Sequence, residues 1–325
     1  MDLVLNTFGT CLTKDNDCFM VLHKDGKQRI PPADLRSIYI SRGAQISSDA
    51  ALLAIDNEIE ILFLNNSGKP SGRIWSNRYG SISTIRKGQL EFSHSKKAVK
   101  WIIEIVASKI ENQQALLWTF AASHPEMNAS TEKAVLRLEN YRKKVIGLQG
   151  ETVADIAPQL RGWEGITSRI YFETFNSFLP ERYRFVERSQ NPAMDVVNAM
   201  LNYGYGILYG KIESSLIRAG IDPYIGIFHR DEHRRPVLVY DVIEKYRIWV
   251  DYVVWMLVRQ NIIGEEYFSV KSDRSCWLEG LGKRIVIQSF NDYLSEVIAI
   301  GGIERSRTTH IDLFTQNLAQ KFKSA

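Results

Sequence analysis

The sequence predicts an α+β fold, in which an amino-terminal antiparallel, sandwich-like β domain is followed by a larger all-helical domain. One basis is the hydrophobic period, which is close to two up to about residue 80 and close to 3.6 beyond it. The other is the length of 325 residues, which suits two domains better than one. We therefore expect a β-rich domain at residues 1–81 and a helical domain at residues 82–325.

Short apolar runs separated by turn residues predict the strands of the first domain. They are LVLNTF at 3–8, CFMVLH at 18–23, SIYIS at 37–41 and IEILFLNN at 59–66. A cap at Ser47 or Ser48 before the apolar run 50–55 predicts one short helix between strands. The glycine, proline and serine residues of 66–73 predict a turn or hairpin tip.

Apolar residues at helical spacing predict the elements of the second domain. The face of a first long helix is marked by Val99, Ile102, Ile103, Val106 and Ile110. Another helix follows the cap-like run NASTE at 128–132, and residues 150–175 suggest two or more helices separated near Arg161 and Gly162. Three further helices are expected within 237–259, 283–298 and 311–322.

A long helix that is opened by Asn191 and Pro192 should end at Gly220. Glycines within it lower helix propensity by about 1 kcal/mol each relative to alanine. Such glycines indicate that a neighbouring element packs closely there; they are Gly204, Gly206 and Gly210.

Composition and charge narrow the class of protein. The net charge of +4 and the sequence pI near 8.8 are compatible with a polyanionic partner but do not require one. The first residues lack the pattern of a signal peptide, and no run approaches the roughly 18 apolar residues of a membrane span, so we expect a cytoplasmic protein. The spacing of Cys11, Cys18 and Cys276 favours reduced structural thiols over metal ligands.

Three ionisable residues share one face of the helix predicted at 237–259. Asp241, Glu244 and Arg247 are spaced three apart, while their neighbours are strongly apolar. Acids in an apolar context require a cation. This strip is therefore the first candidate site.

Three interpretations of the strip remain open. Glu244 forms an ordinary ion pair with Arg247 or Lys245 on a helix surface. Alternatively, His229 and His233 bind zinc, although Pro236 argues against a regular helix through both histidines. In the third interpretation, carboxylates and one imidazole bind a hard ion such as Mg²⁺ or Mn²⁺. By spacing alone, Glu164 is an ordinary exposed glutamate beside Trp163.

Three segments taken together resemble the CRISPR-associated protein one family, the catalytic subunit of the integrase that inserts spacers into CRISPR arrays. They are EGITSRIYF at 164–172, the stretch 191–229 that ends in GIFH, and PVLVYDVIEKYR at 236–247. The resemblance extends over essentially the whole chain. It implies a β domain followed by a helical catalytic domain.

The resemblance also implies a set of site residues. It makes Glu164, His229 and Glu244 the ligands of Mg²⁺ or Mn²⁺, with Asp241 as a nearby acid that is a further candidate ligand. Tyr209 matches a family tyrosine close to the reacting DNA end. Basic residues near the motifs are candidate phosphate contacts, namely Arg161, Arg169, Lys211 and Arg247.

The activity implied by the resemblance serves antiviral defence. A 3′-hydroxyl of a spacer duplex attacks a phosphodiester at a CRISPR repeat, and the same site acts as an endonuclease on branched DNA. The implied partners are DNA, a second copy bound through the β domain, and a small companion subunit. The alternative from a different class is a non-catalytic dimeric scaffold that binds branched DNA.

Overall fold

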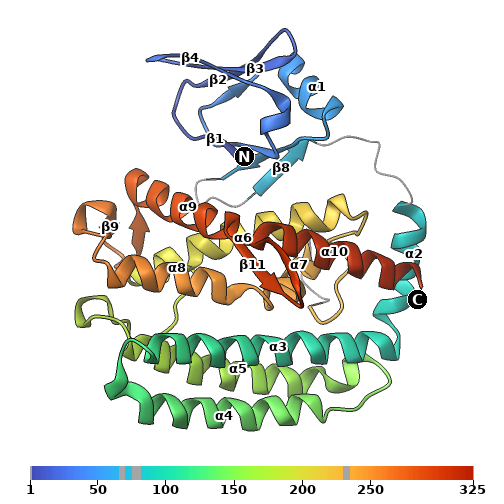
Figure 1. The fold of residues 1–325 in the computed structure, drawn as a ribbon, viewed down its shortest axis with the longest axis vertical. Coiled ribbons are helices and arrows are strands. Elements are labelled where there is room, and N and C mark those ends of the chain that lie inside the picture. The colour runs from blue at the N-terminus through green and yellow to red at the C-terminus, as the bar shows by residue number, and fades with distance from the viewer. Residues whose placement is uncertain (1, 66–69, 75–81, 230–234, 325) are drawn as a thin grey trace. The chain divides into compact units, whose positions relative to one another are not determined.

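The computed structural model describes residues 2–65, 70–74, 82–229 and 235–324 of the 325-residue chain (Figure 1). The chain divides into two compact units, Met1–Gly80 and Ser81–Ala325, beside the boundary expected between residues 81 and 82. Each unit has its own core of buried apolar side chains. The order of the two units is therefore a β-rich unit followed by a mainly helical one.

The strands of the first unit form two four-stranded sheets within its described residues, ordered β1-β5-β7-β8 and β4-β3-β2-β6. Their bounds are β1 Asp2–Leu5, β2 Cys11–Asp15, β3 Cys18–His23, β4 Gly26–Ile30, β5 Ser37–Ile40, β6 Gln45–Ile46, β7 Glu60–Leu64 and β8 Pro70–Ile74. The core between them contains the fully buried side chains of Leu12, Phe19, Ile38 and Ile61.

The two sheets are mixed, so the expectation of a purely antiparallel domain is wrong. β5 runs parallel to both β1 and β7, and β6 runs parallel to β2. Parallel neighbours need a crossover connection. The helix α1, Ser48–Asp56, lies in the connection between β5 and β7. Apolar alternation reports which face of a strand is buried and carries no information on strand direction.

Helix α1 confirms the short helix predicted from its serine cap. The Ser47 hydroxyl accepts a hydrogen bond from the backbone N–H of Ala50 at 3.2 Å. The predicted turn at 66–73 is only partly observed, because residues 66–69 lie outside the described residues. The remainder of that segment begins β8, which pairs antiparallel with β7.

The second unit is built mainly from long helices (Figure 1). Their bounds are α2 Ile82–Ser93, α3 Lys96–Ala121, α4 Asn128–Ile146, α5 Val153–Ser177, α6 Val196–Arg218, α7 Val237–Ile243, α8 Arg247–Arg259, α9 Gly280–Ser295 and α10 Arg307–Lys323. Helices α3, α4 and α5 run alongside one another, and each packs against the other two (Figure 1). Helix α6 packs against α7, α8, α9 and α10.

The sequence predicts that this unit is all-helical, but the structure also contains strands there. Two antiparallel hairpins interrupt the helices: β9 Phe268–Val270 with β10 Cys276–Leu278, and β11 Val297–Ile300 with β12 Ile303–Ser306. These strands are only three or four residues long. Such short runs carry too little period-two signal to be distinguished from loops or helix ends.

Two helix boundaries differ from the predicted ones. α5 continues through Pro158 and past Arg161 and Gly162, where a break was expected, because α3 and α4 pack along it and outweigh local propensity. The helix predicted at 237–259 is instead two helices. Between α7 and α8, the N–H groups of Lys245 and Tyr246 bond to carbonyls three residues back, so the chain tightens and turns.

The long helix α6 begins later than predicted and ends where predicted. Asp195 caps it by accepting from the N–H of Asn198 at 2.8 Å, and Gly220 follows its end with a φ of +79°. The close packing predicted at Gly204 is confirmed. A Cβ atom there would lie 2.5 Å from Cγ1 of Val250 on α8.

No helix within the described residues is both long and apolar enough to cross a membrane.

Candidate metal centre

Two glutamates that are far apart in the sequence face each other in the helical unit. Glu164 lies on α5, and Glu244 lies at the end of α7 where the chain turns into α8. Between them is the ammonium group of Lys109 from α3, 2.7 Å from Oε1 of Glu164 and 2.5 Å from Oε2 of Glu244. The guanidinium Nε of Arg247 donates to Oε1 of Glu244 at 2.7 Å. Two acids and two bases therefore form one cluster.

This cluster is removed from bulk water. The side chains of Lys109 and Glu244 are each 7% exposed and that of Glu164 is 17% exposed. Oε2 of Glu244 is fully buried and receives no well-directed hydrogen bond, so its contact with Lys109 is an ion pair. Removing one partner from such a cluster leaves an uncompensated buried charge, which costs several kcal/mol.

His229 is held beside this cluster by Asp241. Nδ1 of His229 donates to Oδ1 of Asp241 at 2.7 Å, and the backbone N–H of His229 donates to the same oxygen at 3.1 Å. The N–H groups of Ile227 and Phe228 donate to Oδ2 at 2.9 and 3.1 Å. Asp241 is fully buried and both of its oxygens are used in this way. The carboxylate thus anchors the loop and the imidazole together.

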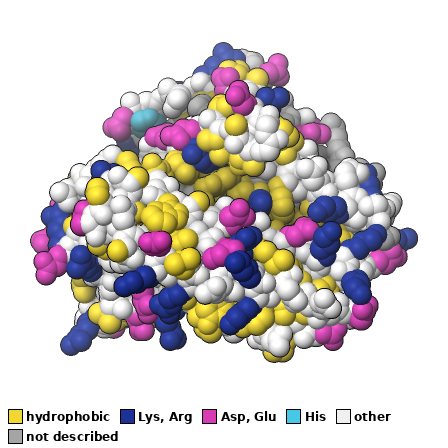
Figure 2. All heavy atoms as spheres, turned by 60° about the horizontal axis from the view of Figure 1, so that its bottom comes forward, with side chains coloured by type: hydrophobic (Ala, Val, Ile, Leu, Met, Phe, Trp, Pro, Cys, Tyr) yellow, Lys and Arg dark blue, Asp and Glu magenta, His cyan; other side chains and the backbone are white. Residues whose placement is uncertain are grey.

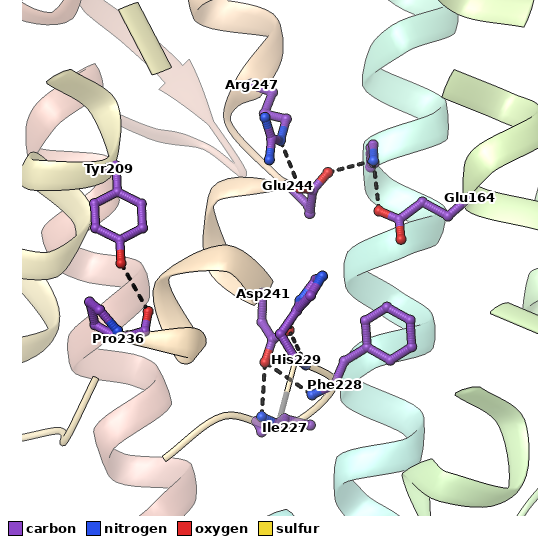
Figure 3. Close-up of polar contacts among 10 residues, drawn as sticks. Glu164, Tyr209, Ile227, Phe228, His229, Pro236, Asp241, Glu244 and Arg247 are labelled. Atoms are coloured by element: carbon purple, nitrogen blue, oxygen red, sulfur yellow. Dashed lines mark hydrogen bonds and ion pairs between the residues drawn. The ribbon is translucent and has the colours of Figure 1, made fainter. Parts of the chain in front are cut away.

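A glycine lets the loop close around Asp241. A Cβ atom on Gly226 would lie 2.2 Å from the backbone oxygen of His229 and 2.7 Å from a methyl of Val237. The bond between Nδ1 and Asp241 leaves Nε2 as the ring nitrogen that is able to bind a metal ion. Figure 3 shows the imidazole extending from Asp241 toward the side on which Glu164 and Glu244 lie.

The charges of the cluster shift the pKa values of its members. Burial by itself would raise the pKa of Glu244, but Arg247 and Lys109 outweigh burial and lower it. Burial would lower the pKa of Lys109, but the two glutamates raise it above its ordinary value. Glu244 and Lys109 are therefore both charged at neutral pH.

The pKa of His229 is shifted by the same balance between burial and nearby charges. Burial by itself would lower its pKa, but the hydrogen bond and charge of Asp241, with smaller contributions from Glu164 and Glu244, raise the pKa above its ordinary value. The imidazole is thus more basic than that of a free histidine.

The donor set fits a hard divalent cation. Two carboxylates and one imidazole suit Mg²⁺ or Mn²⁺, and metal-binding histidines commonly donate their other ring nitrogen to a carboxylate. Within the described residues, no three His, Cys, Asp or Glu side chains converge closely enough to hold an ion. The Lys109 ammonium separates the two glutamates that would do so. The residues fit a metal ion once this ammonium moves.

Tyr209 is connected to His229 through a second aromatic ring. The ring of Tyr240 lies 5.2 Å from that of Tyr209 and 6.0 Å from that of His229, between centroids. The Tyr209 hydroxyl donates to the carbonyl oxygen of Pro236 at 3.2 Å (Figure 3). Burial raises the pKa of Tyr209, so the phenol stays protonated at neutral pH.

The four predicted phosphate contacts lie in different environments. Arg161 and Arg169 are exposed on α5, and the guanidinium of Arg161 lies 5.3 Å from the ring centroid of Phe228 in the histidine loop. Arg247 belongs to the carboxylate cluster. Lys211 is buried on α6, and its role as a DNA contact stays a prediction.

Lys109 is a site residue that was not predicted from the sequence. A usable signal was present, since Lys109 falls on the face marked by Val99, Ile102 and Val106, three residues after the last of these. A lysine on the buried face of a helix requires an acidic partner. Which acids these are depends on tertiary packing, so the sequence does not reveal them.

A buried network behind Arg247 was also missed. Asp251 on α8 accepts hydrogen bonds from the hydroxyls of Tyr171, at 2.8 Å, and Tyr205. The guanidinium of Arg247 lies 4.8 Å from the ring centroid of Tyr205. Burial raises the pKa of Asp251 to about 6, against the lowering effect of the two tyrosine hydroxyls and of Arg188 and Arg247. Asp251 thus holds the ring of Tyr205, against which the guanidinium of Arg247 packs.

The structure also bears on the alternatives left open by the sequence. The pair between Glu244 and Arg247 exists, but Glu244 is buried, so it is not a surface ion pair. Lys245 instead lies with its ammonium 5.7 Å from the ring centroid of Phe314. The zinc alternative depends on His233, which lies outside the described residues.

A family model and a related protein both place this chain in the same family. The family model described as CRISPR associated protein Cas1 matches residues 3–292. A CRISPR-associated endonuclease Cas1 from Archaeoglobus fulgidus is 33% identical over 307 residues, which cover 90% of this chain and 88% of that protein.

Solved structures agree on the fold. A casposase bound to an integration product superposes with a TM-score of 0.84 at 20% identity, covering 99% of this chain and 90% of the other. A chain of a Cas6-RT-Cas1–Cas2 complex superposes with a TM-score of 0.80 at 22% identity, covering all of this chain but 35% of that longer one. The chain belongs to the CRISPR-associated protein Cas1 family and is a metal-dependent endonuclease and integrase of spacer acquisition.

Proposed function

We propose that Glu164, His229 and Glu244 together bind one Mg²⁺ or Mn²⁺ ion and form the catalytic centre of this enzyme. The observation that supports the proposal is the convergence of α5, the histidine loop and the α7–α8 turn on one buried cluster (Figure 3). A divalent ion bound there would polarise the phosphoryl oxygens and stabilise the charge that develops in phosphodiester transfer.

The surrounding residues hold the proposed ligands in place. Asp241 fixes the tautomer of His229, because a carboxylate accepts the Nδ1 proton and leaves Nε2 unprotonated. Both oxygens of Asp241 already accept hydrogen bonds, which favours a positioning role over direct ligation. Arg247 holds one oxygen of Glu244, and Asp251 acts through Tyr205 on Arg247.

DNA is the proposed substrate, both as a spacer duplex and as a CRISPR repeat. Arg161 and Arg169 on α5 are proposed to contact its phosphates, and Tyr209 is proposed to lie close to the reacting end. On the face shown in Figure 2, Lys and Arg side chains are interspersed with Asp and Glu, without one dominant basic patch. Phosphate contacts position the DNA but read no bases.

Two protein partners are proposed. One is a second copy of this chain, bound through residues 1–81, and the other is a small companion subunit of the CRISPR adaptation complex. A chain of a Cas6-RT-Cas1–Cas2 complex that has the same fold supports the second proposal. A cytoplasmic location also remains a prediction.

A strand-transfer assay tests the proposed function. Purified protein, with and without the companion subunit, is incubated with a labelled duplex and a supercoiled plasmid that carries a CRISPR repeat. We expect joined and nicked products with Mg²⁺ or Mn²⁺ and none after chelation. Binding of branched DNA without any metal-dependent product would instead favour the non-catalytic scaffold.

Metal binding should depend on pH through His229. Its pKa is raised above the ordinary value, and a metal ion binds only the neutral imidazole. Affinity for Mn²⁺ should therefore fall by about tenfold per pH unit once the pH is below that raised pKa. Calorimetric titration with Mn²⁺ between pH 6 and 8.5 measures the effect.

Two variants control this measurement. His94→Gln alters an exposed histidine in the α2–α3 connection and should leave the pH profile unchanged. His229→Gln should remove the profile along with most of the affinity. A wild-type affinity that does not change over this pH range would exclude His229 as a ligand.

A further inference from the structure

Lys109 is the only charged residue that contacts both proposed glutamate ligands among the described ion pairs. Its ammonium lies 2.7 Å from Glu164 and 2.5 Å from Glu244. It reaches them from α3, a helix that carries none of the proposed ligands. Its position between two hard oxygen donors is the position that a cation bound by both would take.

The charges of the cluster are balanced with Lys109 in place. Glu164 and Glu244 carry two negative charges, and Lys109 and Arg247 carry two positive ones. A divalent ion added to this arrangement would introduce two further positive charges beside an ammonium in a poorly hydrated site. Like charges at such distances repel strongly when water is excluded. The ion and the ammonium therefore compete for the same oxygens.

We propose that Lys109 is a resident counter-ion that occupies the metal position in the metal-free protein and must be displaced when the metal ion binds. The inference rests on the proposed metal site. Without metal, the ammonium keeps the two carboxylates paired and the helices α3, α5 and α7 together. With metal, the protein loses these ion pairs, so its affinity for the ion is lower than its ligands alone would give.

The variant Lys109→Met tests the competition by measuring binding and stability, without relying on activity. Methionine preserves much of the side-chain volume and removes the charge. Electron paramagnetic resonance of free Mn²⁺ during titration should show at least about tenfold tighter binding than in wild type, because the repulsion is removed. The melting temperature without metal should fall, and Mn²⁺ should raise it by more than in wild type.

Lys96→Met is the matched control, because it makes the same substitution on the same helix. Lys96 pairs with Glu151 at 2.6 Å, but both side chains are largely exposed, at 72% and 80%. Both Mn²⁺ affinity and melting temperature should stay at wild-type values. Lys109→Arg keeps the charge and addresses the case in which methionine prevents folding; it should bind Mn²⁺ no more tightly than wild type.

The outcomes separate the inference from the proposed function. If Glu164→Gln abolishes Mn²⁺ binding but Lys109→Met leaves the affinity equal or weaker, the counter-ion role is wrong and the metal site stands. Tighter binding by Lys109→Arg would also contradict the counter-ion role. If Glu164→Gln binds Mn²⁺ as wild type does, the proposed metal site itself is wrong.

Discussion

Replacing Glu164 with glutamine should reduce metal-dependent strand transfer and nicking by about a thousandfold, or about 4 kcal/mol of transition-state stabilisation. Glutamine has nearly the same shape but offers a neutral amide in place of a charged oxygen donor. The fold should survive, because Glu164 is partly exposed and Glu244 keeps Arg247 as a partner. Single-turnover assays with saturating Mg²⁺ and with Mn²⁺ measure the loss.

Glu173→Gln is the appropriate control for this result. Glu173 lies on the same helix, α5, and is exposed, so its loss of charge should leave the rate unchanged. Equal activity of Glu164→Gln and wild type under both metals would show that α5 supplies no ligand. Equal losses in both variants would show a general effect of charge on DNA binding.

Asp241→Asn should weaken Mn²⁺ binding by about 10- to 100-fold, a smaller loss than removal of a ligand should cause. The asparagine side chain has one oxygen where aspartate has two, so its amide nitrogen must face either the backbone N–H groups or His229. We also expect a loss of about 1–3 kcal/mol of folding stability from the unsatisfied groups. Calorimetry with Mn²⁺ and thermal unfolding measure the two effects.

The pH profile distinguishes positioning from direct ligation. Because Asp241 raises the pKa of His229, Asp241→Asn should shift the pH dependence of Mn²⁺ binding to lower pH. The control Asp292→Asn changes an exposed acid on α9 that bonds to Gln288, and it should shift nothing. An unchanged profile together with a loss as large as that of Glu164→Gln would make Asp241 a ligand.

Hydrophobic period and helix caps in the sequence were sufficient to predict part of the fold. The change of hydrophobic period gave the order of a β-rich and a helical unit, and the caps gave α1 and the end of α6. Strand direction depends on the route of the chain between strands, which period-two alternation does not encode. The break between α7 and α8 also escaped prediction, because no glycine or proline marks it and the apolar residues on either side keep a helical spacing.

Some residues of the candidate site could likewise be predicted from local sequence, and others could not. Asp241, Glu244 and Arg247 were recognisable as a strip because they share one chain segment. Glu164 had no local signal, since eighty residues separate it from Glu244, and only the family resemblance selected it. Lys109 lies on a third helix and belongs to the site through packing alone. Residues that converge from separate helices become a site only when the fold is known.

Locating a bound ion in a crystal tests whether Glu164, His229 and Glu244 bind one metal ion. Crystals grown with Mn²⁺, measured near the manganese absorption edge, locate the ion directly by its anomalous signal. We expect one peak bound by the carboxylates of Glu164 and Glu244 and by Nε2 of His229, with the Lys109 ammonium withdrawn from both glutamates. Absence of that peak in Mn²⁺-saturated crystals, with Lys109 still bridging the two glutamates, would contradict the claim.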